Sequence, residues 1–245
     1  MPKQVFKFKD VIISSIVADR ANKGYIKESN YRFDKESEDY VPVSVANKDI
    51  MREILMPGNE VRKNMKLLGK LPIEATDKDF KVADQIIDHI EGLALKALTD
   101  ELQGYEKNIY YIYEGDEVTS YDFGLIASFP SSFKRMVKND ALEVSIGKLC
   151  GDVGYIGKVG EKIATDLKIV NHVFSRNYNA HIYTATTPEN NLVTFWSQKS
   201  TEDLAKVGKT IKVTAKIKKT IESRFYPGVK ETQLNYVKKG WLILQ

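Results

Sequence analysis

Lysine recurs at alternate positions of the segment 210–221, between apolar residues. The apolar set is Ile211, Val213, Ala215 and Ile217, and the polar set is Lys212, Thr214, Lys216 and Lys218. Side chains two positions apart share a face in a β-strand, so the pattern predicts a strand with one buried face and one basic face. A row of ammonium groups on such a strand can neutralise successive phosphates of a nucleic-acid backbone.

Aromatic residues and further cations lie close to this segment along the chain. Rings stack on nucleobases of any type and cations follow the backbone, so the combination is typical of single-stranded nucleic-acid binding. The expected phosphate contacts are Arg176, Lys199, Lys212, Lys216, Lys218, Arg224 and Lys230, and the expected ring contacts are Tyr183, Trp196, Phe225 and Tyr226; His181 could contact phosphate or stack. Core packing is the alternative for each ring, because a small domain needs several large side chains inside.

Charge is unevenly distributed along the chain. Residues 151–245 contain 15 Lys and Arg against 8 Asp and Glu, a net charge of +7, whereas residues 1–150 contain 22 against 25, a net charge of −3. A basic C-terminal part indicates a polyanionic partner. A lysine-rich surface that contacts only solvent is the alternative, since excess lysine is common on protein surfaces.

The composition is that of an ordinary globular chain. With 245 residues, 42% hydrophobic and 29% charged, it has room for one large domain or two small ones. No segment approaches the roughly 20 apolar residues that cross a bilayer, so we expect no membrane contact. The N-terminus lacks the apolar core of a secretory signal and Cys150 is the single cysteine, which predicts a cytoplasmic protein without an internal disulfide.

Motifs that resemble catalytic machinery fail on their spacing. Gly208-Lys209-Thr210 imitates the end of a phosphate-binding P-loop, but position 203 is aspartate where the first glycine is required, and a strand is expected after the lysine. Carboxylates at Asp77, Asp79 and Asp84 could serve a nuclease or polymerase subunit, although the first two are explained by the start of a helix.

Histidine and cysteine offer no better case for chemistry. The histidines, His89, His172 and His181, are isolated in sequence and do not pair at metal-ligand spacing, and Cys150 has no identifiable base. We therefore expect no enzyme activity, no metal and no cofactor.

The N-terminal part of the chain predicts a mixed, largely helical domain. Short apolar runs at 5–8 and 11–17 suggest strands, and the aromatic run 110–113 suggests a strand or a buried connector. Helices are expected at 47–68 with a break at Pro57, at 76–104 with Thr76 as the cap, and at about 120–142 with a break near Pro130.

The C-terminal part predicts a small barrel. Glycines concentrated in 147–160 indicate a junction, so we expect domains at 1–146 and 147–245. Strands are expected at 162–174, 180–187, 192–197, 210–222 and 231–244, with a helical turn at 202–205. Five strands with a helical segment between the third and fourth is the layout of an OB-fold, so the predicted class is α+β with a C-terminal five-stranded OB barrel.

Three segments of this part carry a resemblance to a known group. The strings at 155–163 (YIGKVGEKI), 192–197 (LVTFWS) and 228–234 (GVKETQL) resemble OB-fold modules of bacteriophage replication proteins. The resemblance implies a phage single-stranded DNA-binding protein that coats single strands during replication or recombination in the bacterial host cytoplasm.

The predicted function is therefore non-enzymatic binding of single-stranded DNA, with RNA as the alternative ligand. The N-terminal domain is expected to mediate self-association or contacts with replication proteins. An accessory or scaffold protein, whose barrel binds another replication or transcription protein, is the competing hypothesis, because OB-folds host many unrelated functions.

Overall fold

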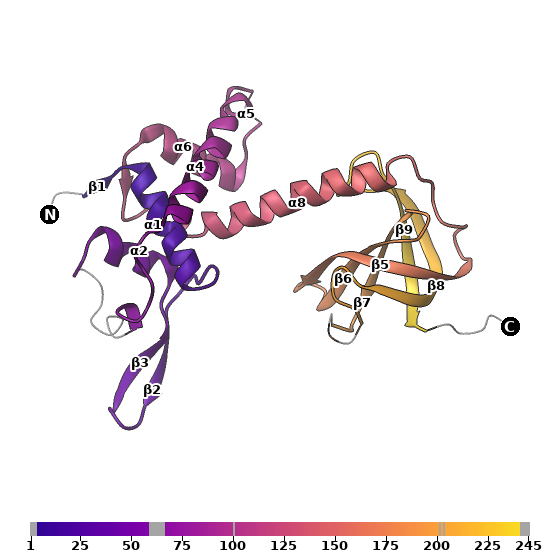
Figure 1. Cartoon of the computed structure of the whole chain (residues 1–245), viewed down its shortest axis with the longest axis horizontal. Helices are drawn as coiled ribbons and strands as arrows, with labels where there is room; N and C mark the ends of the chain where they lie inside the picture. Colours follow the sequence, from indigo (N-terminus) through magenta and orange to yellow (C-terminus); the bar gives the residue numbers. More distant parts are fainter. Residues whose placement is uncertain (1–3, 59–66, 100, 201, 203, 241–245) are drawn as a thin grey trace. The chain divides into compact units, whose positions relative to one another are not determined.

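The computed structural model describes residues 4–58, 67–99, 101–200, 202 and 204–240. The chain divides into two compact units, residues 1–137 and 138–245 (Figure 1). Helix α8, Phe129–Cys150, contributes its first turns to one unit and its last turns to the other. The junction that the sequence places at 146/147 falls inside this helix. Both units together make a mixed α+β fold.

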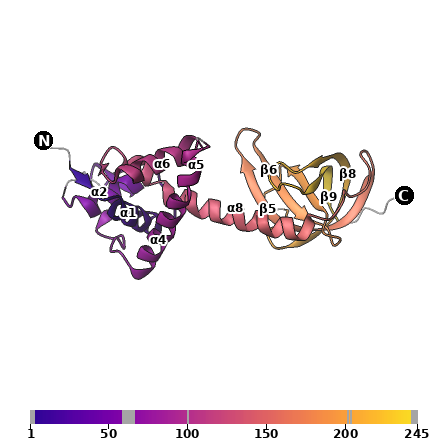
Figure 2. The ribbon, with the colours of Figure 1, turned by 90° about the horizontal axis from the view of Figure 1, so that it is seen from above.

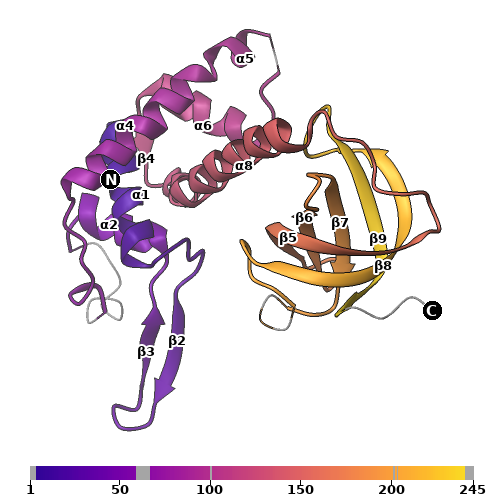
Figure 3. The same ribbon diagram turned by 45° about the vertical axis from the view of Figure 1, so that its right-hand side comes forward.

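The first unit consists of helices and two small β-pairs. Its helices are α1 (Phe8–Ala21), α2 (Asn47–Leu55), α4 (Asp77–Gly92), α5 (Ala94–Leu98), α6 (Gly104–Gly115), α7 (Phe123–Ile126) and the start of α8. Strand β1 (Val5–Phe6) pairs with β4 (Val118–Thr119), and β2 (Asn30–Asp34) pairs with β3 (Asp39–Ser44) in a hairpin that projects from these helices (Figure 3). No helix in the described part of the chain is long and apolar enough to cross a membrane.

Helix α1 corrects the prediction of strands at 5–8 and 11–17, of which only the pair Val5–Phe6 is a strand. The helix is buried on most sides, so its residues lack the single apolar stripe that identifies a surface helix. Ser14 and Ser15 donate their hydroxyls to the carbonyls of Val11 and Ile12 at 2.8 and 2.7 Å, and therefore tolerate burial. The run 110–113 is likewise helical, within α6, rather than a strand.

Local signals set several other helix boundaries as predicted. The N–H of Thr76 donates to the Asp79 carboxylate at 2.8 Å, in a capping box that begins α4. Pro130 lies in the first turn of α8, where a missing N–H costs nothing, and separates that helix from α7. Helix α2 ends at Leu55, before Pro57, but most of the expected second helix lies outside the described residues. The helix predicted at 76–104 is divided into α4 and α5.

The second unit is a closed five-stranded barrel, as predicted. Its strands are β5 (Lys162–Ser175), β6 (Ala180–Thr186), β7 (Leu192–Ser197), β8 (Thr210–Glu222) and β9 (Lys230–Lys239), in the order β5-β6-β7-β9-β8. Strand β5 also pairs with β8, which closes the barrel, and β7 with β9 is the parallel pair. The helical turn expected at 202–205 lies partly outside the described residues.

The interior of the barrel follows the predicted alternation of β8. Ile211, Val213, Ala215 and Ile217 are buried, whereas Lys212, Lys216 and Lys218 are exposed. Thr214 departs from the pattern, because it is buried and donates its hydroxyl to the carbonyl of Gly240 at 3.2 Å. The rings of Tyr183 and Phe195 stack in this core with centroids 5.1 Å apart.

The last turns of α8 pack against the outside of the barrel (Figure 2). Ile146 and Cys150 from the helix form an apolar cluster with Leu192, Tyr226 and Val229 from the barrel. Burial raises the pKa of the Cys150 thiol, which disfavours the reactive thiolate. This contact holds the last turns of α8 against the barrel.

Candidate nucleic-acid interface

On the outer face of β6 and β7, residues that are opposite one another in the strand register form successive rows, one apolar and one of threonines. In the strand register Val173 is opposite Ile182, and Ile182 is opposite Trp196. Opposed side chains lie on the same side of a sheet, so these three form one outward row. Thr184 and Thr194 form the next row, which β9 extends at Gln233. We call this surface the outer face.

A hollow of about 420 Å³ lies at one side of the outer face, and we call it the Trp196 hollow. Its exposed rings are Trp196 and Tyr178, which meet edge to face with centroids 5.1 Å apart. Lys218 reaches the same hollow, beside a bulge of β8 between Ile217 and Lys219. Two rings and an ammonium group in one hollow are suited to a nucleobase and its phosphate.

A buried carboxylate, Glu231, joins the strands under this hollow. It accepts hydrogen bonds from Thr194 at 2.6 Å, Ser223 at 2.8 Å and Gln233 at 3.1 Å, and it is only 3% exposed. These donors come from β7, from the loop after β8 and from β9. A buried carboxylate needs such donors, so the three contacts hold the loop and both strands in one arrangement.

The loop 223–229 between β8 and β9 presents two of the predicted site residues. The N–H of Ser223 donates to the carbonyl of Val229 at 2.8 Å, which closes the base of the loop. Arg224 and Phe225 project from it, and the Phe225 side chain is 77% exposed. Both residues line a second hollow that also borders the outer face.

The remaining predicted cations do not all gather at the outer face. Arg176 is exposed in the β5–β6 loop, two residues before Tyr178, and Lys199 is exposed just after β7. The exposed Lys216 lies opposite Lys162 on β5. Lys230 places its ammonium 5.9 Å from the centre of the Tyr155 ring.

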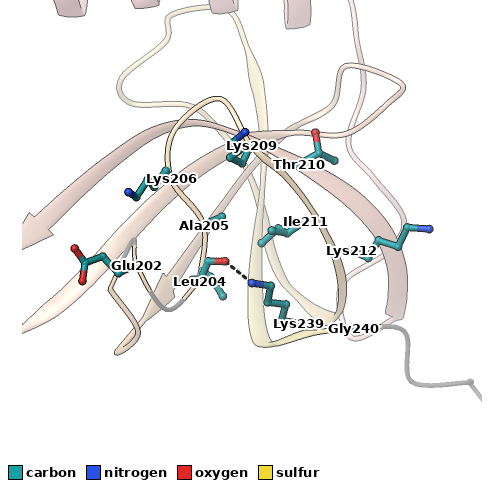
Figure 4. A pocket seen from close by; sticks show the side chains of 10 residues that line it. All are labelled: Glu202, Leu204, Ala205, Lys206, Lys209, Thr210, Ile211, Lys212, Lys239 and Gly240. Atoms are coloured by element: carbon teal, nitrogen blue, oxygen red, sulfur yellow. Dashed lines mark hydrogen bonds between the residues drawn. The ribbon is translucent and has the colours of Figure 1, made fainter.

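Lys212 belongs to a different site at one end of the barrel (Figure 4). This hollow, of about 520 Å³, is also lined by Lys206, Lys209 and Lys239, and Lys239 donates to the carbonyl of Leu204 at 2.9 Å. Strand β8 separates Lys212 from Lys218 by roughly 20 Å at the usual rise per residue. The lysine row of β8 therefore does not form one short phosphate track inside the Trp196 hollow.

Two predicted stacking residues are buried instead. Tyr183 is 0% exposed, and its hydroxyl donates to the carbonyl of Lys199 at 2.9 Å. Tyr226 is buried against the end of α8, and burial raises its pKa. Core packing therefore excludes both rings from stacking on a base at the surface.

The sequence predicts isolated histidines, but in the structure His172 and His181 are paired. Their Nε2 and Nδ1 atoms are 2.7 Å apart, and the rings stack with centroids 5.0 Å apart. His172 is opposite Tyr183 in the register, so the pair lies on the Tyr183 side of the hairpin and not on the outer face. Sequence spacing gave no sign of the pair, because the hairpin register creates it. In the residues that the structure describes, no group of three or more His, Cys, Asp or Glu could hold a metal ion.

Comparison with known protein families, with curated proteins and with solved structures found no match to this chain. Tyr178, which is 69% exposed, is the main contributor that the sequence reasoning missed. Its place in the turn between two predicted strands, beside Arg176, was the signal that could have found it.

Loss of the Glu231 carboxylate should weaken the barrel. Glu231→Ala leaves buried donors without an acceptor, and we expect a loss of about 2–4 kcal/mol in the free energy of unfolding. Urea unfolding followed by tryptophan fluorescence measures this, since the two tryptophans of the sequence, Trp196 and Trp241, both fall in the C-terminal part of the chain. Glu222→Ala, at an exposed position at the end of β8, is the control and should stay within about 0.5 kcal/mol of wild type. Equal effects of the two changes would contradict the role of Glu231.

The histidine pair should make barrel stability depend on pH. Burial and the neighbouring His181 lower the pKa of His172, so the unfolded chain binds a proton near pH 6.5 that the folded barrel binds only at lower pH. Stability should therefore decrease as pH falls from about 6.5 towards the lowered pKa. The urea midpoint at pH 7.5 and 5.5 measures this, and His172→Gln should show a smaller difference than wild type. A His172→Gln difference as large as that of wild type would refute the assignment.

Proposed function

We propose that the barrel is an OB-fold and that it binds single-stranded DNA across the outer face, without enzymatic activity. The strand order, with the first strand closing on the fourth and a parallel third and fifth strand, supports the OB assignment. OB-folds bind oligonucleotides on strands two and three and on the loops between strands one and two and strands four and five. In this barrel those elements are β6, β7 and the loops that carry Tyr178 and Phe225.

The Trp196 hollow is the observation that carries the proposal. Trp196 is 49% exposed although it is a large apolar ring, and it lies beside the exposed Tyr178 ring and Lys218. Apart from their edge-to-face contact with each other, these rings leave much of their surface open, and each base stacked on a ring contributes roughly 1–3 kcal/mol to binding. Lys218, Arg176 and Lys199 supply phosphate contacts around the rings.

The biological setting is part of the same proposal. The resemblance of 155–163, 192–197 and 228–234 to phage replication modules supports a role in coating single strands during phage replication or recombination. The site of action is then the cytoplasm of the bacterial host. The first unit would contact a second copy or other replication proteins.

A titration with single-stranded DNA, duplex DNA and RNA of matched length tests the function. We expect quenching of tryptophan fluorescence by the single strand and weaker binding of the duplex. If roughly four phosphates are neutralised, a tenfold rise in salt should weaken binding by about three powers of ten, at ~0.7 log unit per phosphate. Binding to single strands that does not respond to salt would refute the phosphate contacts. A folded protein that binds no strand would favour a protein-binding barrel.

Trp196→Ala should lower the affinity for single-stranded DNA by roughly 5- to 100-fold, because a stacking surface is removed while the barrel core is unchanged. Phe174→Ala is the matched control. Phe174 is an exposed ring on the neighbouring β5–β6 hairpin, but it faces the histidine side. Fluorescence anisotropy of a labelled oligonucleotide measures both variants, and a similar loss in both would argue against the Trp196 hollow.

A further inference from the structure

A second hollow lies between the last turns of α8 and the β5–β6 hairpin, and we call it the α8 hollow. Its volume is about 480 Å³, in the range of small-ligand sites. Leu142 from the helix and Val173 and Ile182 from the hairpin form its apolar walls. Phe225 adds an exposed ring from the loop 223–229. Apolar walls with one ring suit a flat aromatic ligand.

Polar side chains that line the α8 hollow can form hydrogen bonds with a ligand. Tyr226, Asn171 and Thr184 all line the hollow, and the side chains of Asn171 and Thr184 partly offset the burial that raises the pKa of the Tyr226 hydroxyl. The side-chain oxygen of Asn171 accepts from the N–H of His172 at 2.9 Å, so its amide group is held in place. A pocket that combines apolar walls with a few fixed polar groups favours ligands of matching shape and polarity.

The rim of the α8 hollow carries charges of both signs. Arg224 is an exposed cation on the loop, and Glu143 is an exposed carboxylate on α8. A carboxylate repels a phosphate backbone, so Glu143 weakens non-specific binding of a polyanion. The same group accepts a hydrogen bond from an exocyclic amino group, as Glu and Asp do with cytosine.

The α8 hollow and the Trp196 hollow border one another. Ile182 lines the first, Trp196 lines the second, and the two residues are directly opposite in the β6–β7 register. Opposed side chains in an antiparallel pair are about 5 Å apart. Neighbouring nucleotides of one strand can therefore occupy both hollows.

Resting on the proposed function, we propose that the α8 hollow receives one unstacked nucleobase and selects a base with an exocyclic amino group over thymine. Phe225 and the apolar walls hold the ring, Glu143 accepts from the amino group, and Arg224 contacts the adjoining phosphate. The protein then prefers some single-stranded sequences over others. The Trp196 hollow alone gives no such preference, because rings stack on bases of any type.

Affinities for an all-thymine oligonucleotide and for the same strand with one central cytosine test the proposal. We expect wild type to bind the cytosine strand roughly five- to tenfold more tightly. Glu143→Gln should remove most of that preference, because an amide can also donate to thymine. Asp140→Asn, on an exposed position of the same helix outside the hollow, removes an equal charge and should keep the preference.

Each outcome of this comparison decides between the hypotheses. Equal wild-type affinity for the two strands, or a preference that survives Glu143→Gln, would overturn the base-selective hollow and leave single-strand binding intact. A preference lost equally in Asp140→Asn would attribute it to net charge and would also overturn it. Absence of binding to both strands would overturn the proposed function, and this inference with it.

Discussion

Closure of the barrel by β5 is the constraint on which the candidate interface depends. The strand pairs through its first half with β8 and through its second half with β6, with a bulge near Ile169 where it changes partner. The pairing begins before the strand itself, since Gly160 donates to the carbonyl of Ile217 at 2.9 Å. Gly157, just before this contact, has φ of +61°, which favours glycine, and a Cβ there would lie 2.7 Å from the end of the Ile217 side chain, which would have to shift. Closure leaves β6 and β7 with one buried face and one outward face.

The outward face is then shaped by two groups of contacts that a barrel alone does not supply. Glu231 links the loop 223–229 to β7 and β9 by hydrogen bonds. The last turns of α8 cover the part of the same face that contains Leu192. Where the helix covers the barrel, Leu192 and Tyr226 are buried, and where it does not, Ile182 and Trp196 face outward. Apolar residues of this surface pack against α8 where the helix covers them. The candidate site contains the apolar residues that the helix leaves uncovered.

The sequence predicted those elements whose pattern is local. Alternation in 210–221 identified β8 and its buried face, and Thr76 and Pro130 marked helix boundaries through contacts within a few residues. The sequence did not predict features that depend on contacts between residues far apart in the chain. Helix α1 is buried on most sides and so shows no stripe, and Tyr183 and Trp196 look alike in sequence until the β6–β7 register assigns one inward and one outward. The pairing of His172 with His181 has the same origin.

In the proposed mode of binding, the lysines of β8 act over a longer distance than the contacts inside a hollow. Lys212 and Lys216 are not among the residues that line the Trp196 hollow, and Lys212 shares the barrel end with Lys206 and Lys209. Exposed cations spread over a surface raise the rate of encounter with a polyanion and respond to salt, but they do not order its bases. Rings and fixed polar groups act at contact distance. In the proposed mode of binding, the charge of the second unit therefore attracts the strand, whereas the outer face and its two hollows determine where each base lies.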